Sequence, residues 1–378
     1  MTAERGFALW RLGFRPFYLL AAIFAALSVA VWTAQFAGYL AYGRHAGPAW
    51  HAHEMIFGYA LAVIAGFLFT IIHSWTQRPT PTGGLLALIV ALWVAARVLV
   101  LTPWGGAIAL ANVAFAIAVA VGIGVPLWQS RNRHNYLFVG LIVLISAALV
   151  VFHLSALGAV ALPAWASLQF GNDVVLLVIA VVAGRVVPLY TNKAVPGAFA
   201  RRSQTVERLA IGGLLGLLAA DLLALSGPVL VALGLALAIV HAWRLLLWDL
   251  RSALRVPLLW VLYIGYAWVP VHLALRAAHE LDWVARPLAV HAFTIGAIGG
   301  LTMAMMIRTA RAHTGRALKA DGSDIMCCAL LAVAAAVRVF WPMIEPGHYV
   351  GATVCSGVLW SGAFALFVVR HGPALVRA

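Results

Sequence analysis

The sequence predicts an all-α fold, a polytopic membrane bundle of about twelve transmembrane helices with both termini in the cytoplasm. Hydrophobic residues make up 64% of the chain and charged residues only 10%, whereas soluble domains carry ~25% charged residues. Apolar stretches long enough to cross a hydrocarbon core of ~30 Å recur along the chain. None alternates with a period of two, and lipid-exposed segments must satisfy their backbone groups internally, so each stretch should be a helix.

We expect residues 1–378 to form a single integral-membrane domain in a bacterial inner membrane, crossing it many times. No polar stretch is long enough for a soluble appendage, and no convincing internal repeat is visible. The predicted spans are 17–41, 54–76, 84–102, 106–128, 137–158, 172–190, 208–226, 228–247, 256–277, 287–308, 326–344 and 349–370.

Charge supports this topology. With the amino terminus inside, most of the 25 Lys and Arg residues fall in cytoplasmic segments, as the positive-inside rule requires. Only Arg44, Arg276 and Arg286 fall in outward loops. The net charge of +14 is explained by this bias, and without interleaved aromatic residues it does not indicate nucleic-acid binding.

Topology also assigns a depth to each histidine. Five should share one level near the periplasmic end of the bundle, namely His51, His53, His153, His272 and His291. Intramembrane polar residues are costly and usually mark function, and most of them here also fall in the outer half. They are Glu54, Arg97, Asn112, Asp173, Asp221 and Arg338. We therefore expect a functional chamber that opens toward the periplasm.

The most specific motif is Trp50-His51-Ala52-His53-Glu54. Residues two apart on an α-helix point about 200° away from each other. His51 and His53 should therefore serve two different metal sites on either side of one helix, provided that the helix begins before them. Imidazole suits iron and copper. The alternative is that both histidines cap the helix or bind interfacial water.

A second candidate face runs along the tenth span, where His291, Thr294, Ile298 and Thr302 recur at helical spacing. His291 could hold a cofactor. The alternative is a face that serves only helix packing and contains one buried, hydrogen-bonded histidine. His153 and His272 are weaker ligand candidates. His241 could be a ligand or an anchor, and His313 a metal ligand or part of a loop turn. Arg338, Arg97 and Arg44 lie at a height suited to haem propionates, because guanidinium pairs with carboxylates.

Several motifs spread over the chain resemble those of the NnrS family. They are Arg15-Pro16-Phe17, Trp50-His51-Ala52-His53-Glu54-Met55-Ile56-Phe57-Gly58, Ala65-Gly66-Phe67-Leu68, Gly184-Arg185-Val186-Val187-Pro188, His291-Ala292-Phe293-Thr294-Ile295-Gly296 and His313-Thr314-Gly315-Arg316. One departure is Ala312, where a glycine is often expected. The resemblance implies a twelve-helix bacterial membrane protein that contains haem b and copper and is tied to nitric oxide metabolism and nitrosative stress.

The hypothesis that follows is an oxidoreductase that reduces two nitric oxide molecules to nitrous oxide, with electrons from quinol or a periplasmic cytochrome. Glu54 is the best candidate for proton relay, although a first-turn carboxylate favoured by the helix dipole explains it equally well. We expect proton uptake from the periplasm. The alternatives are a non-enzymatic haem protein that binds nitric oxide or transfers electrons, and a metal or haem transporter.

Overall fold

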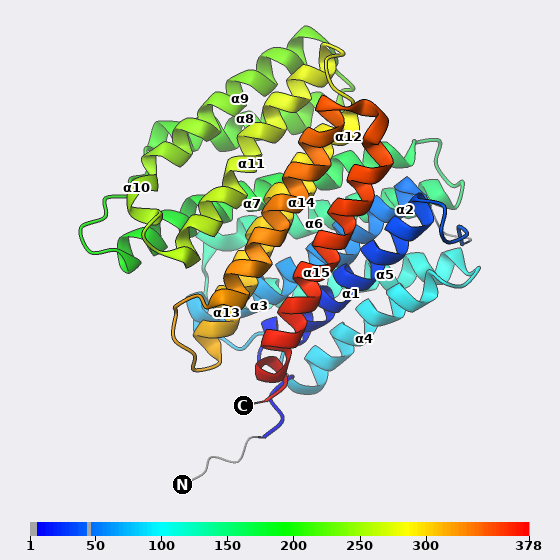
Figure 1. The fold of residues 1–378 in the computed structure, drawn as a ribbon. Helices are drawn as coiled ribbons and strands as arrows, with labels where there is room; N and C mark the ends of the chain where they lie inside the picture. The colour runs from blue at the N-terminus through cyan, green and yellow to red at the C-terminus, as the bar shows by residue number, and fades with distance from the viewer. Residues whose placement is uncertain (1–5, 44–46, 378) are drawn as a thin grey trace.

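Helices account for most of the described chain, residues 6–43 and 47–377, in this computed structural model (Figure 1). One isolated bridge, Phe7–Arg377, is the only β pairing in these residues. The helices are α1 (Phe14–Phe36), α2 (Pro48–His53), α3 (Leu61–Thr76), α4 (Gly83–Leu99), α5 (Gly105–Gln129), α6 (Tyr136–Ala156), α7 (Ala164–Ala194), α8 (Gln204–Leu222), α9 (Pro228–Leu247), α10 (Leu250–Ala253), α11 (Pro257–Glu280), α12 (Arg286–His291), α13 (Gly300–His313), α14 (Gly322–Ile344) and α15 (Tyr349–Val376). Two π-helical segments, η1 (Glu54–Ala60) and η3 (Ala292–Gly299), and two short 3-10 turns, η2 (Arg133–Asn135) and η4 (Pro346–His348), complete them.

The predicted polytopic helical bundle is confirmed, and each of the twelve predicted spans overlaps a helix. Ten continuous helical segments of the described chain are long and apolar enough to cross a membrane. Of the remaining two, α4 is shorter at 17 residues, and α8 carries Glu207, Arg208 and Asp221 near its ends. Some boundaries differ from the prediction. The second span begins at Pro48, because proline favours the first turn of a helix, and α7 extends beyond the predicted 172–190 on both sides.

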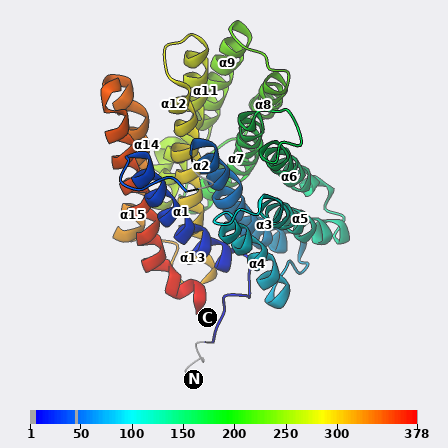
Figure 2. The ribbon, with the colours of Figure 1, turned by 90° about the vertical axis from the view of Figure 1, so that its right-hand side faces the viewer.

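The two ends of the described chain meet at one end of the bundle (Figures 1 and 2). The Ala8 N–H donates to the Val376 carbonyl at 2.8 Å. The Arg15 guanidinium, on α1, donates to the carbonyls of Ala374 and Leu375 on α15. Adjacent ends require an even number of membrane crossings, as the charge pattern predicted.

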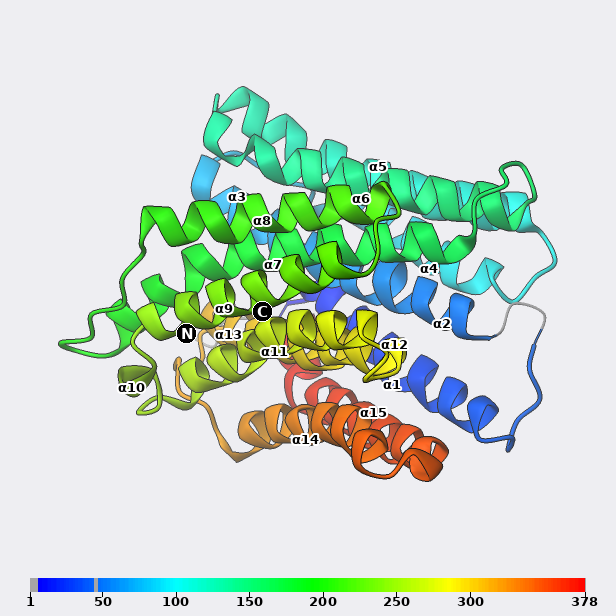
Figure 3. The ribbon, with the colours of Figure 1, turned by 90° about the horizontal axis from the view of Figure 1, so that it is seen from above.

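Figure 3 shows how the helices are distributed. Helices α4 to α9 follow one another, each packed on the next, and α1 packs on both α3 and α15. Helix α14 and segment η3 pack together, and α11 packs on η3. The broken helices α2–η1–α3 and α12–η3–α13 thus lie inside the bundle.

These two broken helices share a design that the sequence analysis missed. Each begins with proline in its first turn, and each becomes π-helical directly after a histidine, His53 or His291. A glycine follows five positions later in both, Gly58 and Gly296. Because π-helical turns occur frequently at functional sites, both segments direct attention to the histidines that precede them.

Candidate functional site

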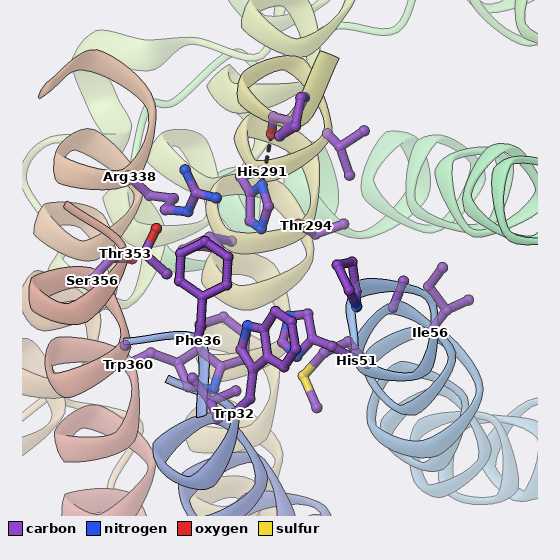
Figure 4. Close-up of a pocket in the computed structure, with 18 of the residues that line it drawn as sticks. Trp32, Phe36, His51, Ile56, His291, Thr294, Arg338, Thr353, Ser356 and Trp360 are labelled. Atoms are coloured by element: carbon purple, nitrogen blue, oxygen red, sulfur yellow. Dashed lines mark hydrogen bonds between the residues drawn. The ribbon is translucent and has the colours of Figure 1, made fainter. Parts of the chain in front are cut away.

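A cavity of about 420 Å³ is lined in part by α2 and α12, which lie toward the end of the bundle opposite the two chain ends (Figure 1). Its walls come from α1, α2–η1, α7, α12–η3, α14 and α15 (Figure 4). Small-molecule and cofactor pockets generally measure ~300–1,000 Å³. The cavity is therefore large enough for an organic cofactor, or for several small ligands.

Two of the predicted histidines line this cavity, His51 from α2 and His291 from α12 (Figure 4). The His51 ring stacks on Trp32 with centroids 4.7 Å apart and planes 13° from parallel. His291 Nδ1 lies 2.6 Å from the Pro287 carbonyl oxygen. A carbonyl can only accept, so Nδ1 carries the proton and Nε2 keeps a free lone pair. That arrangement is typical of a metal-binding histidine.

Arg338 from α14 reaches into the same cavity near His291 (Figure 4). It is 5% exposed, and it donates from Nη2 to the Tyr349 hydroxyl at 2.6 Å. Its Nη1 is buried without a partner among the described residues. No Asp or Glu belongs to the described cavity lining, so this buried cation has no counter-charge there. A bound anion would supply one.

His53 faces away from the cavity, toward α6. Its ring centroid lies 5.0 Å from that of His153 and 4.6 Å from that of Phe152. Both histidines are buried, and the Nε2 atom of each has no partner within the described chain. Two imidazole rings in contact, each with an unpaired nitrogen, form a candidate pair of metal ligands.

A buried ion pair supports His53. Glu54 is 1% exposed; its Oε1 lies 2.9 Å from His53 Nδ1 and its Oε2 accepts from Arg97. Arg97 also donates to the Asn112 side chain. The carboxylate therefore fixes the proton on Nδ1 and leaves Nε2 as the acceptor.

The structure places the predicted site residues in two groups. Helix α2 begins before His51, so the condition on the predicted opposite facing is met, and the two histidines do face different neighbours. His51, His291 and Arg338 belong to the cavity. His53, His153, Glu54 and Arg97 form the second group, behind α2, and none of them lines the cavity.

The other predicted ligands are dispersed. His272 is buried beside Phe293, and its Nδ1 lies 2.8 Å from the Ala289 carbonyl. His241 lies 2.7 Å from the Tyr266 hydroxyl. His313 packs on Phe14 near the chain ends. Arg44 lies outside the described residues. Among residues 6–43 and 47–377, no three or more His, Cys, Asp or Glu side chains form a metal-binding group.

Sequence reasoning missed several residues of the cavity. Gln169 and Asn172, on α7, and Arg286, on α12, line it together with Trp32. The predicted span beginning at 172 left Gln169 in a loop, and the outward-loop assignment of Arg286 hid its approach to the cavity. The spacing of Gln169, Asn172 and Asp173 on one helical face was the available signal.

The sequence was compared with protein families and with curated proteins. A family model described as NnrS protein matches residues 8–378, nearly the whole chain. No curated protein matches the sequence significantly.

Proposed function

Because the chain belongs to the NnrS family and is a multi-pass membrane protein related to nitric oxide, we propose that it reduces nitric oxide to nitrous oxide with haem b and copper. The observation that carries this proposal is the division of one motif between two histidine sites. His51 faces the cavity, and His53 faces His153 on the other side of the same helix.

The cavity residues fit a haem. His51 and His291 offer imidazoles from two sides of a cavity of about 420 Å³. Arg338 and Arg286 offer two guanidinium groups for two propionates, and Arg338 Nη1 is buried without a partner in the described chain. Trp32 stacks on His51 and would hold its ring orientation.

The second site fits copper. His53 and His153 each have a buried, unpartnered Nε2 in the described chain, and imidazole is a favourable copper ligand. Glu54 sets the His53 tautomer and Arg97 compensates the charge of that carboxylate. Glu54 is therefore assigned a positioning role beside His53, and its role in proton relay stays a prediction from the sequence.

A haem held by His51 and His291, with copper held by His53 and His153, would supply electrons and positive charge to bound nitric oxide. The residues of the chain would orient the bound groups, exclude water and compensate charge. His51 and His291 would hold the haem in place, and the aromatic side chains Phe36 and Trp360 keep the cavity apolar. Arg338 stabilises negative charge at the cavity wall.

The proposed location is a bacterial inner membrane, with the cavity toward the periplasm. Lys and Arg gather at the end of the bundle that carries the chain termini, and that end should be cytoplasmic. The electron donor would be a quinol or a periplasmic cytochrome. A quinol would reach this end of the bundle from the bilayer, and a cytochrome from the periplasm.

A second candidate function is electron transfer or nitric oxide binding without turnover. It is favoured by the presence of both His51 and His291 on one cavity, because a haem held by both imidazoles would have no position free for nitric oxide. The spectrum of the reduced protein distinguishes the two functions. A five-coordinate haem that binds nitric oxide and produces nitrous oxide supports the reductase, whereas a six-coordinate haem unchanged by nitric oxide contradicts it.

The direct test measures haem and copper per chain in the purified protein, together with nitrous oxide formed from nitric oxide and a chemical reductant. The proposal expects both cofactors and catalytic nitrous oxide production. The proposal would be overturned if the purified protein were colourless and metal-free while the same protein still protected cells against nitric oxide.

A further inference from the structure

A chain of polar side chains connects the outer end of the bundle to the cavity through α7. Gln169 lines the cavity and donates from Nε2 to Asp173 Oδ1 at 3.0 Å. Arg276, on α11, donates to the same Oδ1 at 3.2 Å and to both oxygens of Asp221 at 2.7 and 2.9 Å. Asp221 lies near the last residue of α8. The chain thus runs from Asp221 to the cavity wall.

The two carboxylate oxygens of Asp173 have unequal surroundings. Oδ1 accepts two hydrogen bonds, whereas Oδ2 is buried without a partner in the described chain. The side chain is 4% exposed. An ionised oxygen left bare at this depth in a membrane protein is costly, whereas a neutral carboxylic acid is much less so.

The local charge also favours a neutral acid. Arg276 is shared between Asp173 and Asp221, so one cation serves two carboxyl groups. The other groups that face this cluster are His272 and Glu280, on α11, Gln169 on α7, and Arg286 on α12, which donates to Gln169 Oε1 at 3.1 Å. Glu280 adds another negative charge and accepts from the Gly227 N–H at 2.7 Å. One proton on Asp173 brings this cluster closer to neutrality.

Other routes to the cavity are poorer. None of its described lining residues is Asp or Glu. Tyr59 points its hydroxyl toward Thr302 at 2.6 Å, and Thr302 donates to the Ile298 carbonyl at 2.6 Å. Thr302 has one hydroxyl proton, so Tyr59 must donate to it and cannot simultaneously donate into the cavity. Glu54 is occupied by Arg97 and His53.

We propose that Asp173 holds a proton at neutral pH and delivers it to the cavity beside Gln169 and Asn172. Asp221 passes the replacement from the outer side through water, because the shared Arg276 keeps its own protons. Asn172 lines the cavity and has a buried, unpartnered Oδ1 in the described chain, so it can accept from a water on this path. Delivery leaves an Asp173 carboxylate beside Arg276, which stabilises it until the next proton arrives.

This inference rests on the proposed function, because joining two nitric oxide molecules consumes two protons and two electrons and yields nitrous oxide and water. The electrons come from the quinol or cytochrome donor. Asp173 supplies protons and undergoes no redox change. Uptake from the outer side means that turnover moves no proton across the membrane.

The first test needs no cofactor and no turnover. Infrared spectra of the purified protein at neutral pH should contain a carboxylic acid C=O band that disappears in Asp173→Asn. The control Asp282→Asn replaces an exposed carboxylate in the α11–α12 loop and should keep the band. A wild-type spectrum that Asp173→Asn leaves unchanged would show Asp173 ionised and would overturn the proposal.

The second test is kinetic and uses liposomes with a pH-sensitive dye outside or inside. Asp173→Asn should slow nitric oxide reduction and the accompanying proton uptake about 10²-fold, with unchanged haem spectra and nitric oxide binding. Asp173→Glu should recover part of the rate. Wild-type rates in Asp173→Asn, or uptake from the inner side, would overturn the proposal. A wild-type protein that shows the Asp173 band but no nitric oxide reduction would instead contradict the proposed function and, with it, delivery for that reaction.

Discussion

The imidazole ring of His53 lies 5.0 Å from that of His153, centroid to centroid, with the ring planes 76° apart. The pair joins α2 to α6 at a point where neither Nε2 has a partner in the described chain. Histidines placed only for packing would be expected to satisfy both ring nitrogens when buried. His241 and His371 also have a buried, unpartnered ring nitrogen in the described chain, but here two such rings lie in contact, which favours a shared ligand over ordinary core packing.

His51→Ala and His53→Ala should therefore have different effects. His51→Ala should remove or alter the haem spectrum and leave copper bound, whereas His53→Ala and His153→Ala should each lower copper and largely retain haem. Haem absorbance and metal analysis of the three purified variants provide the measurement. Loss of the same cofactor in His51→Ala and His53→Ala would show that the two histidines serve one site.

Replacing Arg338 should stabilise the cofactor-free protein but weaken its binding of haem. Replacement by methionine keeps similar length and removes an uncompensated buried cation, so the cofactor-free bundle should become more stable by roughly 1 kcal/mol or more. Haem retention should fall, because a propionate partner is lost. Thermal unfolding with and without haem reports both effects, and Arg133→Met, at an exposed position of the short turn η2, is the control. Lower stability of cofactor-free Arg338→Met would contradict this assignment.

Much of the fold could be predicted because membrane insertion imposes a strong composition signal on every span. The same reasoning predicted the facing of His51 and His53, which follows from helix periodicity alone. It could not pair His53 with His153, because that contact depends on how α2 packs against α6. Sequence periodicity fixes where a side chain points on its own helix but not which neighbouring helix it meets.

The roles of the arginines show the same limit. Arg97 and Arg338 share a depth, and depth alone suggested that both bind propionates. In the structure, Arg97 pairs with Glu54 outside the cavity, and Arg338 lines the cavity. The π-helical segments that follow His53 and His291 also escaped prediction, because their sequences are as apolar as those of ordinary spans.

Removing only one member of the Glu54–Arg97 ion pair should destabilise the protein more than removing both. Arg97→Leu leaves a buried carboxylate beside His53 and should destabilise the protein by about 3–5 kcal/mol. The double variant Glu54→Gln with Arg97→Leu should recover much of this loss, because no unpaired charge remains. Thermal unfolding of both variants and of Glu54→Gln completes the double-mutant cycle. Equal stability of Arg97→Leu and the double variant would exclude the proposed coupling.

Asp321 should make stability depend on pH at the end of the bundle that carries the chain termini. Burial alone would raise the pKa of Asp321, but hydrogen bonds from Arg370 and the Asp324 N–H, with the Arg311 charge, hold it below its ordinary value. A carboxyl with a lower pKa in the folded state stabilises the protein above its unfolded pKa of ~3.9. This contribution is lost as pH falls through the folded-state pKa.

The matching variant is Asp321→Asn, which keeps a good helix cap and removes the charge. Its side chain position is 35% exposed, so the loss at neutral pH should be modest, about 0.2–1 kcal/mol. The difference from wild type should shrink below about pH 4. Unfolding curves over that range measure it, with Asp282→Asn as a control that should show no such trend. If the difference in stability stays constant with pH, the Asp321 charge does not contribute to stability as proposed.

Gly184 tests how tightly the inner part of the bundle is packed. A Cβ at this position would fall on the Arg244 guanidinium and lie 2.9 Å from Glu207 Oε2. Arg244 cannot easily move, because it donates to Glu207, to the Ala180 carbonyl at 2.9 Å and to the Tyr266 hydroxyl at 2.8 Å. Gly184→Ala should therefore destabilise the protein by about 1–3 kcal/mol.

The control is Gly216→Ala on α8, where an added Cβ meets nothing within 4 Å. Alanine is a better helix residue than glycine by roughly 0.5–1 kcal/mol, so this variant should be as stable as wild type or more so. Neither Gly184 nor Arg244 lines the cavity, so Gly184→Ala should lower the unfolding temperature without changing the haem spectrum. Equal unfolding temperatures for the two variants would mean that the Arg244 network yields easily, and that Gly184 is not required for close packing.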